Sequence, residues 1–133
     1  MVMINMAQNI PPQLQNQIVE LQQLQQRYEM LLQQKGTLDK NIREITKAIE
    51  ELEKITDDSK VYKSLGSILL SADKTSLKEE LVEKKETFEM RLKTIERQEE
   101  RTKKAFEEKR AAVQNALSSQ MGASGGNLDL GPM

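Results

Sequence analysis

Cysteine, histidine and tryptophan are all absent from this 133-residue sequence. Without cysteine there can be no disulfide framework, no thiolate nucleophile and no thiolate metal ligand. Without histidine, the commonest general base and metal ligand is missing as well. No glycine-rich phosphate loop opens a helix, because the glycine cluster at 122–126 lies in the last part of the sequence with no helical pattern after it. The sequence therefore gives no support for an enzyme, a metal site or a bound cofactor.

Long apolar runs are also absent. No uninterrupted run approaches the roughly 20 residues that a helix needs to cross a bilayer, and the apolar start at residues 1–4 is too short for a secretory signal. The charges are nearly balanced, with 20 Lys plus Arg and 21 Asp plus Glu. Electrostatics therefore do not favour a nucleic acid or an anionic membrane as the partner. These features predict a cytoplasmic protein.

Aromatic residues are scarce, with two Phe and two Tyr, while 31% of the residues are charged. This composition favours long helices with a narrow apolar seam over a globular core. In the first half of the chain, apolar residues recur with coiled-coil spacing, and only Gln17 and Lys35 break the seam. The pattern predicts a first helix over about 12–56, which starts at a proline pair that a helix tolerates there. The seam positions are Leu14, Gln17, Leu21, Leu24, Tyr28, Leu31, Lys35, Leu38, Ile42, Ile45, Ile49 and Leu52.

The pattern changes after this helix. Residues 56–59 favour caps and turns, and residues 61–70 are rich in β-branched, aromatic and aliphatic side chains around a central glycine. We interpret this stretch as a β-hairpin over about 60–71, with its turn at 65–67. A lone two-stranded hairpin is not stable because both of its edges lack partners. The sequence contains no other strand candidate, so the missing strands should come from other chains.

A second helix is predicted over about 76–118, beginning with a Ser-Leu-Lys-Glu capping box. The two helices have similar lengths and a short connection, so they should pack antiparallel. If Leu52 faces Leu81, the same register brings Lys35 beside Glu99. These two side chains either form an ion pair or each reach water. Polar residues interrupt the second seam at Lys85, Glu99, Thr102 and Lys109.

The predicted fold is mainly α: a long antiparallel two-helix coiled coil with one β-hairpin at its base. We expect residues 1–117 to form a single domain. Residues 119–133, with four glycines and a proline, are predicted to be disordered. A two-helix hairpin buries only one stripe of each helix, so the isolated chain should be marginally stable and should favour an oligomer.

The two ends of the chain are nearly free of charge. Residues 1–26 contain one ionisable side chain, Glu20, and residues 111–133 contain one, Asp129. In the predicted fold both segments meet at the open end of the coiled coil, where Met and aliphatic side chains suit a surface that binds varied unfolded polypeptides. Alternatively, these are ordinary seam residues at fraying helix ends. The candidate client-binding residues are Ile10, Leu14, Ile18, Leu21, Val113 and Leu117.

Four segments carry a resemblance to a known family. They are the hairpin segment Val-Tyr-Lys-Ser-Leu-Gly at 61–66, the helix start Asp73-Lys74, the opening Gln-Asn-Ile-Pro-Pro-Gln at 8–13, and Arg-Leu-Lys-Thr-Ile-Glu-Arg-Gln-Glu-Glu at 91–100. Together they resemble the β-type subunit of archaeal prefoldin over about residues 8–117. A single hairpin favours this type over the α-type subunit, which has two. Residues 1–7 extend beyond the usual start of the family.

The resemblance implies a chaperone subunit that works without ATP. Two α and four β subunits would join through their hairpins into a double β-barrel, and the coiled-coil tips would capture unfolded proteins and deliver them to a group II chaperonin. The alternative hypothesis is a structural coiled-coil tether or adaptor that does not bind clients. By the resemblance, the assembly residues are Val61, Tyr62, Leu65, Ile68, Leu69 and Leu70.

Overall fold

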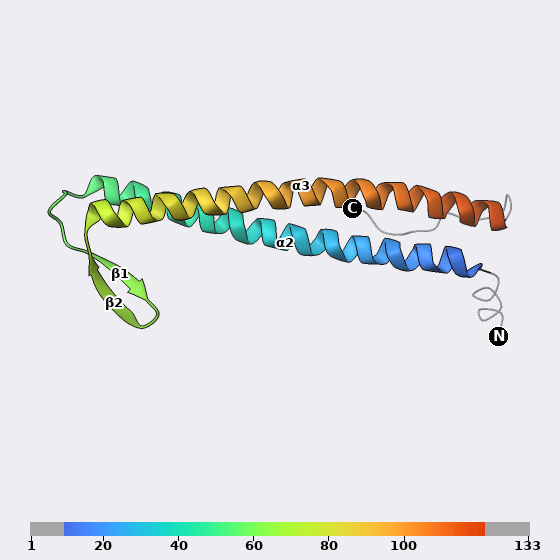
Figure 1. The fold of residues 1–133 in the computed structure, drawn as a ribbon, viewed down its shortest axis with the longest axis horizontal. Coiled ribbons are helices and arrows are strands. Elements are labelled where there is room, and N and C mark those ends of the chain that lie inside the picture. Colours follow the sequence, from blue (N-terminus) through green and yellow to red (C-terminus); the bar gives the residue numbers. More distant parts are fainter. Residues whose placement is uncertain (1–9, 122–133) are drawn as a thin grey trace. The chain divides into compact units, whose positions relative to one another are not determined.

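A computed structural model describes residues 10–121 of the chain. The predicted fold class, two long helices joined by one β-hairpin, is confirmed (Figure 1). The first helix ends two residues before its predicted end, and the second continues three residues past residue 118. Residues 119–133 were predicted to be disordered, which is wrong for residues 119–121, because α3 continues to Met121. The rest of that prediction, for residues 122–133, and the prediction for residues 1–7 lie outside the described residues. In chain order the elements are helix α2 (Pro12–Lys54), strand β1 (Val61–Leu65), strand β2 (Ile68–Ala72) and helix α3 (Lys74–Met121).

The described residues form two compact units. We call Gln33–Glu96 the hairpin unit, because it contains both strands. The remainder, of which the structure describes residues 10–32 and 97–121, is the terminal unit. Helices α2 and α3 each contribute one segment to each unit, so each unit has a seam of its own.

The terminal unit has a well-buried apolar core. Leu21, Phe106 and Val113 are at most 2% exposed, and Leu14 and Leu31 are buried with them. All five lie on the apolar stripes that the coiled-coil pattern predicts for the two helices. The terminal unit therefore buries these seam residues within one chain.

Thr102 departs from the predicted pattern. We expected this residue to interrupt the seam of the second helix, yet it is buried, with 6% exposed. No buried side-chain nitrogen or oxygen of the described residues lacks a hydrogen-bond partner, so this burial leaves no polar atom stranded. Lys109, another predicted interruption, instead reaches out to Glu20 of α2, with 2.6 Å between Nζ and Oε2. A short polar side chain thus fits the seam, whereas a long charged one leaves it.

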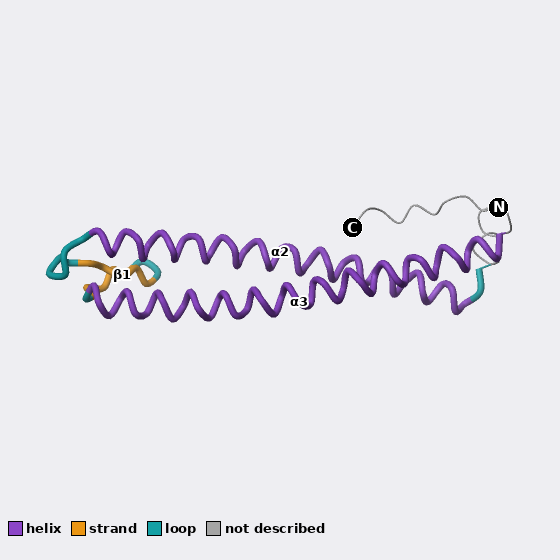
Figure 2. Tube along the Cα trace, turned by 90° about the horizontal axis from the view of Figure 1, so that it is seen from above, coloured by secondary structure: helices purple, strands orange, loops and turns teal. Residues whose placement is uncertain are grey.

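In the hairpin unit the two helices lie side by side (Figures 1 and 2). They bury their seam residues less completely than the terminal unit does. Leu38 and Leu52 of α2 are buried, whereas Phe88 of α3 is only half-buried. Lys78 of α3 contacts Glu53 of α2, with 3.0 Å between Nζ and Oε1. This packing holds the helix pair from which the strands emerge.

The predicted β-hairpin is present. Strands β1 and β2 pair antiparallel in a register that runs from Val61 opposite Ala72 to Leu65 opposite Ile68, and Figure 2 draws them in orange. The turn is a two-residue loop in which Gly66 has a φ of 62°. A type II′ turn places glycine at this first central position, since other residues are strained there.

Asp73 caps helix α3. Its Oδ2 accepts hydrogen bonds from the backbone N–H of Ser76 at 3.0 Å and from the Ser76 hydroxyl at 2.9 Å. These bonds lower the pKa of Asp73 below its ordinary value of 3.8, and the bond from the backbone N–H of Ser76 has the largest effect. The capping box predicted to start at Ser76 was therefore wrong. The helix begins at Lys74, because aspartate is a strong N-cap and its charge suits the positive end of a helix.

Two lysines attach the hairpin and its entry loop to α3. Nζ of Lys74 donates to the carbonyl of Ile55 at 2.8 Å and to Oδ1 of Asp57 at 3.0 Å. Lys63 of β1 forms an ion pair with Glu80 of α3. These contacts tie the loop at 55–60, drawn in teal in Figure 2, and the middle of β1 to the first turns of α3.

Candidate functional site

The hairpin exposes a concentration of large apolar side chains. Five of the six predicted assembly residues are 46–68% exposed, and Val61 is half-buried. Monomeric proteins rarely expose contiguous apolar patches of this kind unless the surface binds something. The five exposed residues are Tyr62, Leu65, Ile68, Leu69 and Leu70.

Both faces of the hairpin are apolar. Directly paired residues share a face, so the pairs Lys63–Leu70 and Leu65–Ile68 lie on one face, and the pair Ser64–Leu69 lies on the other with Tyr62. The first face carries the Lys63 side chain that pairs with Glu80, yet its aliphatic residues remain exposed. Because both faces of the hairpin carry apolar residues, burial of these residues requires a contact on each face.

The edges of the hairpin are open as well. The sheet has two strands, β1 and β2, so within residues 10–121 each strand pairs along one edge and leaves the other edge without a strand. Unpaired backbone N–H and C=O groups on such an edge are a template for a further strand. The described hairpin therefore combines exposed apolar faces with strand edges that no described strand covers.

The predicted client-binding residues divide into two groups. Leu14, Leu21 and Val113 are at most 4% exposed and belong to the core of the terminal unit. Ile10, Ile18 and Leu117 are half-buried. Contact of the first group with a client therefore requires the helix ends to separate, while the second group is partly accessible as it stands. The six predicted client-binding residues are Ile10, Leu14, Ile18, Leu21, Val113 and Leu117.

The terminal unit also contains a groove between its two helices. The groove has a volume of about 420 Å³, and its lining contains no ionisable side chain. Leu14 and Pro11 contribute apolar surface from one side and Ala116 from the other, with amides and a hydroxyl around them. A concave, largely apolar surface with a few polar groups is the usual form of a binding site. The lining residues are Pro11, Gln13, Leu14, Gln17, Ala116 and Ser119.

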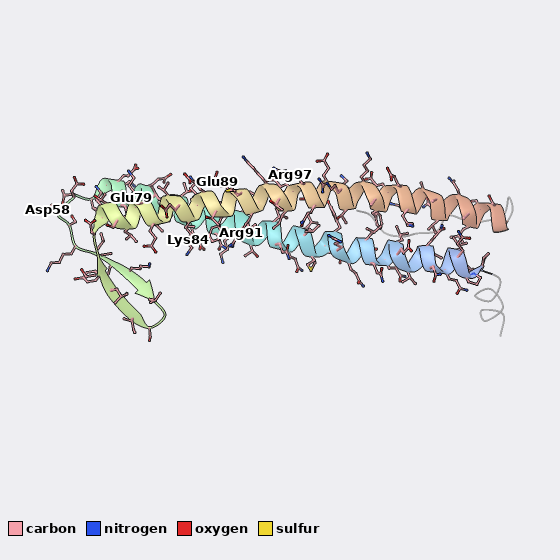
Figure 3. The ribbon with its side chains drawn as sticks, viewed as in Figure 1. Asp58, Glu79, Lys84, Glu89, Arg91 and Arg97 are labelled. Carbon is pink, nitrogen blue, oxygen red and sulfur yellow. The ribbon has the colours of Figure 1, made fainter. Side chains whose placement is uncertain are left out.

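Charge is sparse around this groove. Glu20, the one acid of residues 1–26, is paired with Lys109 in the terminal unit. The helices of the hairpin unit differ: Lys84 Nζ and Arg91 Cζ lie 5.9 and 5.8 Å from the Phe88 ring centroid, and Figure 3 labels both cations. Within the terminal unit, residues 10–26 and 111–121 thus offer a surface nearly free of charge, whereas residues 97–110 are densely charged.

Four large exposed apolar residues on the helices were missed by the sequence analysis. Val19 and Met30 are about half exposed, Leu32 is 41% exposed, and Met90 of the hairpin unit is 70% exposed. Val19 and Met30 are separated by 11 residues, about three helical turns, and so share one face of α2. The four residues were missed because the heptad pattern scores only seam positions. A search for apolar residues off the seam would have found all four.

The described residues contain neither a candidate metal site nor a candidate membrane span. Within the described part of the chain, no group of three or more His, Cys, Asp or Glu side chains could hold a metal ion. No helix among residues 10–121 combines the length and apolar character needed to cross a membrane.

Comparison with known proteins gives a consistent result. The family profile "Prefoldin subunit" matches residues 15–120. The prefoldin subunit beta of Archaeoglobus fulgidus is 43% identical over 113 residues, which cover 85% of this chain and 97% of that protein. The prefoldin subunit beta of Methanococcoides burtonii is 39% identical, with 86% and 98% covered.

A solved structure agrees with these sequence matches. The crystal structure of the prefoldin beta subunit from Thermococcus strain KS-1 aligns with a TM-score of 0.73 at 38% identity. The alignment covers 81% of this chain and 95% of the other. Its fold is similar to the arrangement of helices and hairpin described above.

Proposed function

The chain belongs to the prefoldin subunit family, and from this premise we propose that it is a β-type subunit of an ATP-independent holdase chaperone. In this proposal the chain assembles through its hairpin and binds non-native polypeptides at the helix ends of the terminal unit. The complex then delivers them to a group II chaperonin. The role includes no catalytic step and requires no cofactor, nucleic acid or membrane. We propose a cytoplasmic location.

One observation carries the assembly half of the proposal. The hairpin exposes five large apolar residues on two faces and has two open edges. Burial of one such side chain contributes about 1.5–3 kcal/mol, so association of hairpins from several chains would recover a large free energy. We propose that two α-type and four β-type subunits pair their hairpins in this way. The assembly residues are Val61, Tyr62, Leu65, Ile68, Leu69 and Leu70.

The client-binding half is supported by the composition of the terminal unit. The groove has no ionisable lining residue, and the partly exposed Ile10, Ile18 and Leu117 belong to the same unit. An unfolded client presents apolar side chains and backbone amides of no fixed charge, and a neutral groove lined by amides accepts both. We propose that Leu14, Leu21 and Val113 join this surface when the helix ends fray.

A second candidate function is a structural tether or adaptor without client binding. It is favoured by the near-complete burial of Leu14, Leu21 and Val113, which gives these residues a packing role. Under this alternative the terminal unit would bind one folded partner or none, and it would be indifferent to unfolded polypeptides.

Two measurements separate these functions. Mass measurement after mixing with a prefoldin α-type subunit should give a species of six chains, whereas a dimer would favour the tether. The assembled complex should also suppress aggregation of a denatured protein. Deletion of residues 1–20 and 112–133 should abolish that suppression while the complex still forms. Full suppression by the shortened complex would contradict client binding at the helix ends.

A further inference from the structure

The groove of the terminal unit is next to the point where the described chain ends. Ser119 lines the groove, and helix α3 ends at Met121, two residues later. The sequence then continues for 12 residues to Met133. The family profile ends at residue 120, so the match to the family assigns this segment no role. Residues 122–133 are here called the C-terminal segment.

The composition of the C-terminal segment fits the groove. The segment begins with Gly-Ala-Ser-Gly-Gly and then carries Leu-Asp-Leu at residues 128–130. Glycine directly after a helix favours a left-handed conformation that reverses the chain direction. Two leucines match the apolar lining, and the amides of Gln13 and Gln17 can donate hydrogen bonds to backbone carbonyls.

Charge complementarity favours the same occupant. The groove includes the first turn of α2, and this turn contains no acidic residue. The N-terminal end of a helix carries a partial positive charge and unsatisfied N–H groups. Asp129 lies between the two leucines and is the one acid of residues 111–133, so it would supply the negative charge that the first turn of α2 lacks.

The segment is long enough to reach. Ala116 lies five residues before Met121, about 7.5 Å along the helix. Leu128 lies seven residues after Met121, and seven extended residues span up to about 24 Å. The groove volume of about 420 Å³ lies within the range of about 300–1,000 Å³ that ligand sites occupy.

We propose that residues 128–130 of the C-terminal segment occupy this groove in the complex without client, and that clients must displace them. The second part rests on the proposed function. Because the segment is covalently attached, its effective concentration at the groove is in the millimolar range. A weak contact is then sufficient to compete with a client at micromolar concentration, and the segment acts as an intrachain regulator of client affinity.

Disulfide cross-linking tests the docking without any client. The chain has no native cysteine, so Gln17→Cys with Leu130→Cys forms the sole thiol pair in each β-type chain of the complex. Oxidation should give an intrachain disulfide, detected by non-reducing gel and peptide mass. Asn16→Cys with Leu130→Cys is the matched control, since Asn16 is exposed and does not line the groove. A second pair, Ser119→Cys with Leu128→Cys, repeats the test from α3.

Equal cross-linking of the Asn16 control, or none in both groove pairs, would overturn the proposal. A disulfide between two chains would assign the groove to a second copy and would overturn it as well.

Client affinity tests the competition. Binding of a fluorescein-labelled, permanently unfolded polypeptide is measured for the complex with the full chain, with the chain ending at Met121, and with Leu128→Ser plus Leu130→Ser. Both changes should strengthen binding roughly threefold to tenfold, because they remove a tethered competitor. Asn127→Ser is the matched control and should bind as the unchanged complex does.

Unchanged or weaker binding after truncation would overturn the regulatory role. Loss of binding in every variant, the unchanged complex included, would overturn the proposed function and the competition that depends on it, while the cross-linking result would still decide whether the segment docks.

Discussion

The two units of this chain solve the same problem, burial of apolar side chains, in different ways. The terminal unit encloses Phe106, Val113 and Leu21 between two helix segments until almost none of their surface is exposed. The hairpin unit leaves Leu69 and its neighbours on the hairpin largely exposed. The difference indicates that the terminal unit stabilises itself within one chain, whereas the hairpin depends on other molecules for its stability.

The largest effect is expected from a charge on the exposed hairpin. Leu70→Asp and Tyr62→Asp should each abolish assembly with partner subunits, because an unpaired carboxylate would be buried among apolar side chains. The helices should stay mostly intact. Mass measurement and circular dichroism test both statements.

Met90→Asp is the control for the hairpin variants, since Met90 is also exposed but lies on α3 rather than on the hairpin. It should leave assembly unchanged. Full assembly of both hairpin variants would remove the contrast between the units.

The second effect compares the two phenylalanines. Phe106 is 1% exposed, whereas Phe88 is half-buried. Phe106→Ala should destabilise the helices by about 3–5 kcal/mol through loss of burial and an unfilled cavity. Phe88→Ala should cost about half of that or less. Urea unfolding followed by circular dichroism measures both, and equal losses would show that the terminal unit is not the better-packed one.

The third effect concerns the cap at the start of α3. Asp73→Ala should lower the thermal midpoint, because the N–H and hydroxyl of Ser76 lose their acceptor. The folded pKa of Asp73 lies below 3.8. The stabilisation is therefore present above that value and is lost as the pH falls through the folded pKa.

Asp58→Ala serves as the control for the cap. Asp58, labelled in Figure 3, lies in the exposed loop between α2 and β1 and makes no hydrogen bond or ion pair with a described residue. Its substitution should leave the thermal midpoint unchanged. A difference between Asp73→Ala and the unchanged chain that persists below the folded pKa would argue against the cap as its cause.

The smallest effect is expected for the ion pair between Glu20 and Lys109. Their side chains are 54% and 29% exposed, and such surface pairs contribute about 0.2–1 kcal/mol. A double-mutant cycle with Glu20→Gln and Lys109→Gln should give a coupling in this range that weakens with added salt. A larger coupling that does not respond to salt would mean that the pair is part of the core.

Much of the fold could be predicted from periodicity. The heptads of α2 and the strand-forming segment with its central glycine correctly indicated two helices and a hairpin. The Ser-Leu-Lys-Glu pattern placed the start of α3 two residues late, whereas the helix start Asp73-Lys74 that carries part of the family resemblance agrees with the structure. Thr102 was treated as an interruption, because a sequence pattern scores polarity and does not measure whether a small side chain fits.

The two candidate sites were predicted from different signals. The hairpin was predicted as an assembly surface because apolar strands without partners leave a clear compositional signal, and the structure shows that five of its six residues are exposed. For the terminal unit, low charge marked the region, but it did not distinguish the buried Leu14 and Val113 from the partly exposed Ile18 and Leu117. That distinction depends on how far each residue is turned from the partner helix.

The sequence by itself determined the order and type of the elements and the absence of charge at both ends, since these follow from local spacing and composition. The tertiary structure alone decided which apolar residues are enclosed and which remain exposed, and that Pro11, Leu14 and Ala116 share one groove. The physical reason is that burial depends on contacts between residues about 100 positions apart in the sequence. The spacing of apolar residues along one helix carries no information about those contacts.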